Sequence, residues 1–166
     1  MSLIDFEMER RANPVDTIEH VAVLRDWTFE RTGEDEIAIS VSGQWTDYHT
    51  SFSWLDEHQA LHVACAFDLK PPERRETELT RLLAKINEQM WMGHFEMWMR
   101  ESIVLYRQSL LLAGNAEATQ PQIEGMFANA VEACDRYFQA FQFVVWAGKT
   151  ASEALGDALF ETEGEA

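Results

Sequence analysis

Histidine side chains are the first groups in this sequence that could carry acid–base or metal chemistry. The five histidines are His20, His49, His58, His62 and His94. His58 and His62 lie four residues apart, a spacing that would place two zinc ligands on one face of a helix. The surrounding pattern predicts a turn and a strand instead, and strand residues four apart are separated by about 13 Å. We therefore expect no metal site.

Carboxylates are abundant, because 29 residues are acidic, and paired carboxylates can perform general acid–base catalysis. The acidic clusters 34–36 and 56–57 lie in predicted turns, where a solvated turn accounts for them. The chain lacks a glycine-rich phosphate loop and the Gly-x-Ser-x-Gly motif of an activated serine. We therefore predict no catalytic residue, no cofactor-binding residue and no cofactor, and we expect a protein that is not an enzyme.

The two cysteines, Cys65 and Cys134, are far apart in the sequence, and the chain has no Cys-x-x-Cys motif. This spacing matches neither the usual redox motif nor the usual zinc motif. We expect both thiols to be buried and to behave as small apolar side chains.

Methionine and tryptophan are concentrated between residues 90 and 99. Met90-Trp91-Met92 and Met97-Trp98-Met99 flank Gly93-His94-Phe95. Both residue types adapt to irregular apolar partners, and both are frequent on binding surfaces. The predicted partner-binding residues are Trp91, Met92, Met97, Trp98 and Met99.

The elements that position these residues follow from the spacing of the apolar side chains. Helical spacing predicts a helix over 14–26. Over 27–69 the period changes to two, which predicts an antiparallel meander of four strands with one apolar face and one small, polar, solvated face. Two prolines at 71–72 end the last strand, and a second helix follows that ends near Gly93.

The segment 94–112 predicts a hairpin with a two-residue turn at Glu101-Ser102. This register would place Glu96 directly opposite Arg107, a favourable cross-strand charge pair. Both faces of the hairpin would then be apolar. One helical layer cannot cover both faces, so the second face would need another layer or another protein chain.

Two further helices are predicted in the C-terminal part of the chain. The longer begins at Pro121, ends near Gly148, and is apolar over so much of its circumference that it must be buried on more than one side. A capping pattern at Thr150 to Glu153 begins a last helix that ends near Phe160.

This order of elements predicts an α+β fold in which an antiparallel sheet, built from hairpins, packs against helices. We expect a single domain over residues 1–166, with mobile ends at 1–12 and 161–166.

The charge of the chain limits the partners it can have. With 13 basic and 29 acidic residues, the net charge is −16, which repels nucleic acid and anionic membrane surfaces. No run of apolar residues is long enough to span a membrane, and acidic residues interrupt the N-terminal apolar residues where a secretory signal would need a continuous run. We therefore expect a cytoplasmic protein that binds neither nucleic acid nor membranes.

Several segments together resemble the YbjN-domain family of bacteria. They are 86–98, 103–107 with 110–112, and, for the alphaproteobacterial branch of the family, 133–149 and 151–155. The resemblance covers about residues 13 to 165. Ser102 departs from it, because glycine is expected there in this branch.

The resemblance implies a regulator of sensory transduction with a fold like that of type III secretion chaperones. Those chaperones are small, acidic α+β proteins, usually dimeric, that hold an extended peptide. The resemblance implies no cofactor and no catalytic residue.

We expect a non-enzymatic regulatory or chaperone-like module, acting as a homodimer that docks another polypeptide. One alternative is a small-ligand sensor or an unrecognised enzyme, with a pocket between the long C-terminal helix and the sheet. Another is a purely structural domain whose Met/Trp cluster is entirely core.

Overall fold

The structure, a computed structural model, describes residues 13–164. Its elements are α2 (Pro14–Leu24), β1 (Thr28–Gly33), β2 (Glu36–Ser42), β3 (Asp47–Leu55), the 3-10 turn η1 (Asp56–His58), β4 (Ala60–Phe67), the 3-10 turn η2 (Glu73–Arg75), α3 (Glu76–Glu88), β5 (His94–Trp98), β6 (Ile103–Leu111), α4 (Gln120–Val145) and α5 (Ala151–Gly164). The predicted α+β fold is confirmed.

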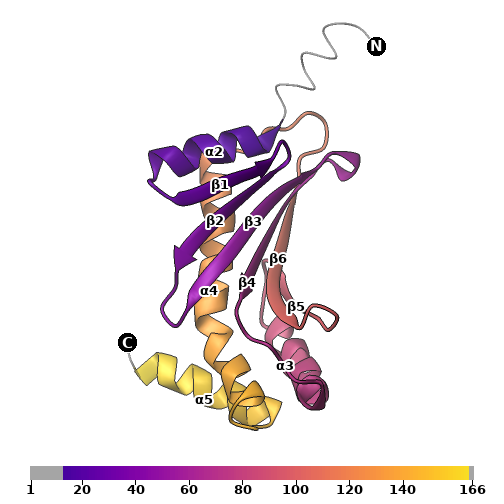
Figure 1. Cartoon of the computed structure of the whole chain (residues 1–166), viewed down its shortest axis with the longest axis vertical. Helices are drawn as coiled ribbons and strands as arrows, with labels where there is room; N and C mark the ends of the chain where they lie inside the picture. The colour runs from indigo at the N-terminus through magenta and orange to yellow at the C-terminus, as the bar shows by residue number, and fades with distance from the viewer. Residues whose placement is uncertain (1–12, 165–166) are drawn as a thin grey trace, which may run out of the picture.

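All strands join one antiparallel sheet of six strands in the order β1-β2-β3-β4-β6-β5. The meander supplies the first four strands, and the hairpin is added with β6 against β4 and β5 at the edge. In Figure 1 the strands pass in front of α4, so the face turned toward the viewer is the one that α4 does not cover. We call this the outer face.

The inner face of the sheet and α4 enclose the core. On β4, the inward residues Leu61, Val63, Cys65 and Phe67 are all buried. The Phe67 ring packs edge-on against Phe138 of α4, with ring centroids 5.1 Å apart. Aromatic rings therefore fill the space between α4 and the sheet in which the ligand-sensor hypothesis would place a pocket.

The starts of the C-terminal helices follow their capping signals. Thr119 forms a capping box with Gln122 at the start of α4, and the Thr150 hydroxyl accepts a hydrogen bond from the backbone N–H of Glu153 at the start of α5. Helix α5 runs to Gly164 instead of ending near Phe160. The expectations for residues 1–12 and 165–166 lie outside the described residues.

The register predicted for the hairpin is wrong by two residues. Glu96 pairs with Leu105 rather than with Arg107, and the connection between the strands is 99–102. The backbone N–H of Ser102 bonds to the Met99 carbonyl, and Ser102 takes a left-handed φ of 51°. The turn is therefore longer than the predicted two-residue loop, and the Asn or Gly that such a short loop favours is not required. A shift of two residues keeps every side chain on its predicted face.

Among the described residues, no helix combines the length and the apolar character that crossing a membrane requires.

Candidate functional site

The outer face of the sheet is built mostly from small side chains. Period-two alternation directs Ser51 and Ser53 of β3, and Ala64 and Ala66 of β4, away from α4. Glu36 of β2 and His49 of β3 also stand on this face, but a larger group of side chains, joined by hydrogen bonds, lies where β4, β6 and β5 are side by side. We therefore place the candidate site at this end of the outer face.

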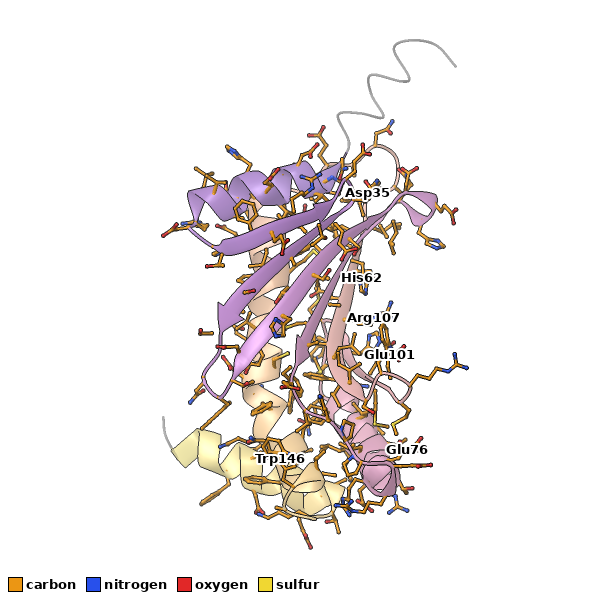
Figure 2. All side chains as sticks on the ribbon, in the orientation of Figure 1. Asp35, His62, Glu76, Glu101, Arg107 and Trp146 are labelled. Atoms are coloured by element: carbon orange, nitrogen blue, oxygen red, sulfur yellow. The ribbon has the colours of Figure 1, made fainter. Side chains whose placement is uncertain are left out.

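A connected group of side chains occupies that end. Arg107 of β6 donates from Nε to His62 Nε2 at 2.8 Å and from Nη1 to Glu96 Oε2 at 2.9 Å. Glu96 also accepts from Trp98 Nε1 and is hydrogen-bonded to His94 Nε2, each at 2.9 Å. Figure 2 shows His62 and Arg107 next to one another over β4 and β6. We call these five residues the outer-face cluster.

Hydrogen bonds set the charge state of Glu96, and burial together with the Arg107 charge sets that of His62. Burial alone would raise the pKa of Glu96, but hydrogen bonds with His94, Arg107 and Trp98 outweigh burial and bring this pKa down to about 2. Burial and the positive charge of Arg107 lower the pKa of His62. His62 is therefore neutral at pH 7, which matches its role as the acceptor of the Arg107 Nε–H.

The outer-face cluster consists of paired charges, imidazoles and an indole ring, joined by hydrogen bonds. Its carboxylate is fully ionised at neutral pH and is already paired with a guanidinium, so it is a poor general acid or base. The cluster contains no serine or cysteine nucleophile. Across the described residues 13–164, no three His, Cys, Asp or Glu side chains converge where they could hold a metal ion.

Trp98 is the aromatic member of the outer-face cluster. Its ring is 42% exposed, and the Arg107 guanidinium carbon lies 5.7 Å from the ring centroid, within the range of a cation–π contact. Its indole N–H is held by Glu96. The contacts with Glu96 and Arg107 therefore hold the Trp98 ring in place.

Trp91 and Met92 lie in the turn between α3 and β5 and are 98% and 55% exposed. Gly93 follows with a left-handed φ of 72°, and the Tyr106 hydroxyl donates to the Met92 carbonyl at 3.1 Å. Gly93 and the hydrogen bond from Tyr106 therefore hold the backbone of this turn in place, while the Trp91 and Met92 side chains point into solvent. We call Trp91 and Met92 the apolar pair.

The apolar pair stands between two hollows. The first, of about 480 Å³, is lined by His62, Trp91, Met92, Gly93, His94, Arg107, Gln108 and Ser109. The second, of about 290 Å³, is lined by Gln89, Met90, Trp91, Met92, Asn129, Glu132, Ala133, Arg136 and Tyr137. The first hollow joins the apolar pair to the outer-face cluster, because His62, His94 and Arg107 line it as well.

The five predicted partner-binding residues do not form one patch. Trp91, Met92 and Trp98 are exposed, whereas Met97 faces inward and packs against the core, and Met99 is half-buried in the hairpin turn. The alternation of β5 separates Met97 from Trp98, because neighbouring strand residues point to opposite faces.

Sequence reasoning did not single out His62, His94, Glu96 and Arg107 as members of a site. The Glu96–Arg107 charge pair was a usable signal, although it pointed to a strand register. The place of His62 depends on the pairing of β4 with β6, which brings residues 45 positions apart into contact.

The Glu96→Gln variant is expected to be less stable than the wild type by about 1 kcal/mol at pH 7. The folded-state pKa of Glu96 is depressed, so its stabilisation is present above the unfolded pKa of about 4.5 and is lost as the pH falls toward about 2. The stability difference between the two proteins should therefore vanish over this range.

Urea unfolding at a series of pH values measures this difference, with Glu101→Gln in the turn of the same hairpin as the control. Glu101 is exposed and has no ion pair among those of the described residues. A Glu96→Gln deficit that stays constant from pH 7 to about pH 2 would contradict the assignment.

Comparison with known proteins decides the family. The YbjN family model, described as "putative bacterial sensory transduction regulator", matches residues 14–143. The chain belongs to the YbjN family. The crystal structure of YbjN from E. coli is 13% identical, with a TM-score of 0.56 over 73% of this chain and 85% of that chain. The predicted family is therefore confirmed, and this YbjN chain shares its fold with the E. coli protein.

A second solved structure, that of the ExsC–ExsE complex, is 15% identical to this YbjN chain, with a TM-score of 0.40 over 60% of this chain and 72% of that chain. No curated protein matches the sequence. The family description supports a regulatory module.

Proposed function

We propose that this chain is a non-enzymatic regulatory or chaperone-like module in the cytoplasm. In this proposal it binds another polypeptide through the outer-face cluster and the apolar pair, and it acts as a homodimer. The observation that carries the proposal is the 98% exposure of Trp91 on a turn whose backbone is held by Gly93 and by the Tyr106 hydroxyl.

The apolar pair supplies the apolar part of the binding energy. Burying a large apolar side chain contributes about 1.5–3 kcal/mol. Since the turn is already fixed, burying Trp91 and Met92 orders only their side chains, and this lowers the entropy cost of binding. The hollows on either side can accept side chains of an extended segment that crosses the pair.

The outer-face cluster supplies polar recognition beside the apolar pair. The side chains of Arg107 and Glu96 are 33% and 30% exposed, and each is held by hydrogen bonds to its neighbours. A partner therefore meets oriented donors and acceptors next to the Trp98 ring, an arrangement typical of interface hot spots. Strand β5 also lies at the edge of the sheet, where an extended peptide can add as a further strand.

The net charge of the chain has opposite effects on its two proposed partners, a basic polypeptide and a second copy of the chain. At −16, the chain attracts a basic polypeptide over long range and repels a second copy of itself. Salt screens both effects. Binding of a basic partner should therefore weaken as salt rises, whereas self-association through apolar side chains should strengthen.

Sedimentation equilibrium tests the homodimer. We expect dimerisation of the wild type to strengthen between about 50 mM and about 500 mM salt. Trp91→Ser or Trp98→Ser should weaken it about 10- to 100-fold. Trp146→Ser is the matched control, since Trp146 is 64% exposed but lies where α4 meets α5, away from the outer-face cluster (Figure 2). A monomer at all accessible concentrations, or an equal effect of all three substitutions, would contradict the homodimer.

Photo-crosslinking tests the polypeptide partner. A photoreactive side chain placed at position 91 should crosslink to a defined polypeptide other than a second copy of this chain, and the same group at position 146 should not. The crosslink should weaken when Trp98→Ser is added. Equal crosslinking from both positions would show that position 91 marks no binding surface.

A further inference from the structure

Two buried thiols meet at the centre of the molecule. Cys65 of β4 and Cys134 of α4 are free cysteines with no exposed surface, and their Sγ atoms lie 3.5 Å apart. The predicted burial is confirmed. Their contact was not predicted, because it depends on how α4 crosses β4. The pair therefore links the sheet to its covering helix.

Hydrogen bonds make the two thiols chemically unequal. Cys134 donates from Sγ to Cys65 Sγ, and Thr50 Oγ1 donates to the same sulfur at 3.5 Å. Thr50 lies opposite Cys65 in the β3–β4 ladder and is fully buried, and its hydroxyl points at Cys65. Cys65 is thus the acceptor of two hydrogen bonds, and Cys134 is a donor.

The same contacts set the protonation of the pair. The hydrogen bond from Cys134 and that from Thr50 lower the pKa of Cys65, although burial opposes them. Burial and the bond to Cys65 raise the pKa of Cys134. Cys65 is the thiol that more readily becomes the nucleophilic thiolate, and Cys134 keeps its proton.

We propose that Cys65 and Cys134 form a dithiol that hydrogen peroxide converts into an intramolecular disulfide between β4 and α4. Cys65 is the attacking thiol, Cys134 the resolving thiol, and Thr50 a positioning residue. This modification is independent of the proposed protein-binding function.

The reaction proceeds in two balanced steps. The Cys65 thiolate attacks one peroxide oxygen and the O–O bond breaks, which gives a sulfenic acid on Cys65 and hydroxide, and the hydroxide takes up the thiol proton to form water. The Cys134 sulfur then attacks the Cys65 sulfur, the S–OH bond breaks, and a second water leaves with the Cys134 proton. The two thiols lose two electrons, and the peroxide is reduced to two waters.

The geometry favours closure within one chain. The sulfurs must approach by about 1.5 Å to reach the disulfide bond length of about 2.05 Å. Complete burial excludes large oxidants such as glutathione disulfide, whereas hydrogen peroxide is close to water in size and can enter through local opening of the core. The pair should therefore respond to small hydroperoxides and not to bulky disulfides.

The proposed disulfide would lie close to the outer face of the sheet. Ala64, the residue before Cys65, pairs with Arg107 across the β4–β6 ladder. A disulfide at Cys65 would form directly beneath the outer-face cluster.

Mass spectrometry of the full-length reduced protein tests the proposal. After exposure to hydrogen peroxide, quenching and alkylation under denaturing conditions, the native protein should lose two hydrogen masses, and a peptide linking Cys65 to Cys134 should be found. Glutathione disulfide should give no such product. The proposal is overturned if both thiols survive, if they react only at denaturant concentrations that unfold the chain, or if the disulfide joins two chains.

Variants test the assigned roles. Cys134→Ala should trap a sulfenic acid on Cys65 that a cyclic dione labels, and Cys65→Ala should leave Cys134 unreactive. Thr50→Val should slow disulfide formation about fivefold, the equivalent of one hydrogen bond, and Thr50→Ser should restore the rate. Near-UV circular dichroism confirms that each variant is folded, and the wild-type experiment stands without them. Equal peroxide reactivity of the two single-cysteine variants would overturn the assigned roles.

Discussion

Replacing Gly93 with alanine is expected to lower the free energy of unfolding by about 3 kcal/mol. Gly93 has a left-handed φ of 72°, a conformation that costs an alanine about 1 kcal/mol. A Cβ at this position would also lie 2.3 Å from Tyr106 Oη. Tyr106 is fully buried and donates to the Met92 carbonyl, so neither the ring nor the turn can move aside cheaply.

The matched control for this substitution is Gly114→Ala. Gly114 has nearly the same φ, 70°, but a Cβ there would have no atom within 4 Å. Its loss of stability should be about 1 kcal/mol, the conformational cost alone. Urea unfolding of both variants separates the steric cost from the conformational cost. Equal losses in the two variants would show that Tyr106 does not restrict position 93.

The consequence of Gly93→Ala for binding follows from the same geometry. The turn that presents the apolar pair is fixed by Gly93 and by the Tyr106 hydroxyl. A variant that remains folded should therefore bind any partner of Trp91 more weakly, even though position 93 itself offers no side chain. Weaker binding by this variant would show that the position of Trp91 and Met92 matters for binding, and not only their apolar side chains.

The elements predicted from the sequence are those whose signals are local. Period-two alternation over 27–69 gives the four strands of the meander, because β2, β3 and β4 each have one buried face and one open face, and half-buried residues alternate with exposed ones in β1. Pro121 near the start of α4 and the capping residue Thr150 act within three residues of the helix starts that they mark, so these starts are fixed by short segments.

The parts that could not be predicted depend on contacts distant in sequence. Nothing near β6 specifies that it pairs with β4, yet this pairing brings His62 to Arg107 and builds the outer-face cluster. The contact of Cys65 with Cys134 likewise depends on the path of α4 across the sheet. In the hairpin, the charge of Glu96 and Arg107 was informative about the face and not about the register, because the two side chains also reach each other diagonally.

The predicted Met/Trp cluster includes the exposed Trp91 and Trp98 but not the exposed Trp146. Trp91 and Trp98 are exposed, as a binding surface requires, while Met97 is directed inward by the strand period. The alternation of the predicted hairpin already placed Met97 and Trp98 on opposite faces, although both were predicted to bind a partner. The Met/Trp content marked the segment, and the strand period decides which of its side chains are exposed.

Asp135→Ala is expected to destabilise the fold by about 2–4 kcal/mol. The Asp135 carboxylate on α4 accepts hydrogen bonds from the Tyr48 hydroxyl and, at 2.8 Å, from the backbone N–H of Gln44. The Asp135 carbonyl also accepts from Trp45 Nε1 at 3.1 Å. These bonds attach the connection between β2 and β3 to helix α4. Removal of the carboxylate leaves the buried Tyr48 hydroxyl without this acceptor.

The electrostatics of Tyr48 agree with its role as the donor. Burial, and then the hydrogen bond and negative charge of Asp135, raise the pKa of Tyr48 well above its usual value, so the hydroxyl keeps its proton at neutral pH. The bond therefore persists over the whole working range. Its loss should appear as a change in stability that is nearly independent of pH between about 6 and 9.

Tyr48→Phe is the control that removes the donor and keeps the carboxylate. It should cost only about 1 kcal/mol, because Asp135 keeps its bond to the Gln44 backbone and no buried donor is left without an acceptor. In the double variant, the cost of Asp135→Ala should shrink, since the hydroxyl that it strands is gone, and this gives a coupling of about 1–3 kcal/mol. Urea unfolding of the four proteins completes the cycle. If Asp135→Ala costs no more than Tyr48→Phe, the carboxylate does not anchor the β2–β3 connection, and packing around the Tyr48 ring carries that contact instead.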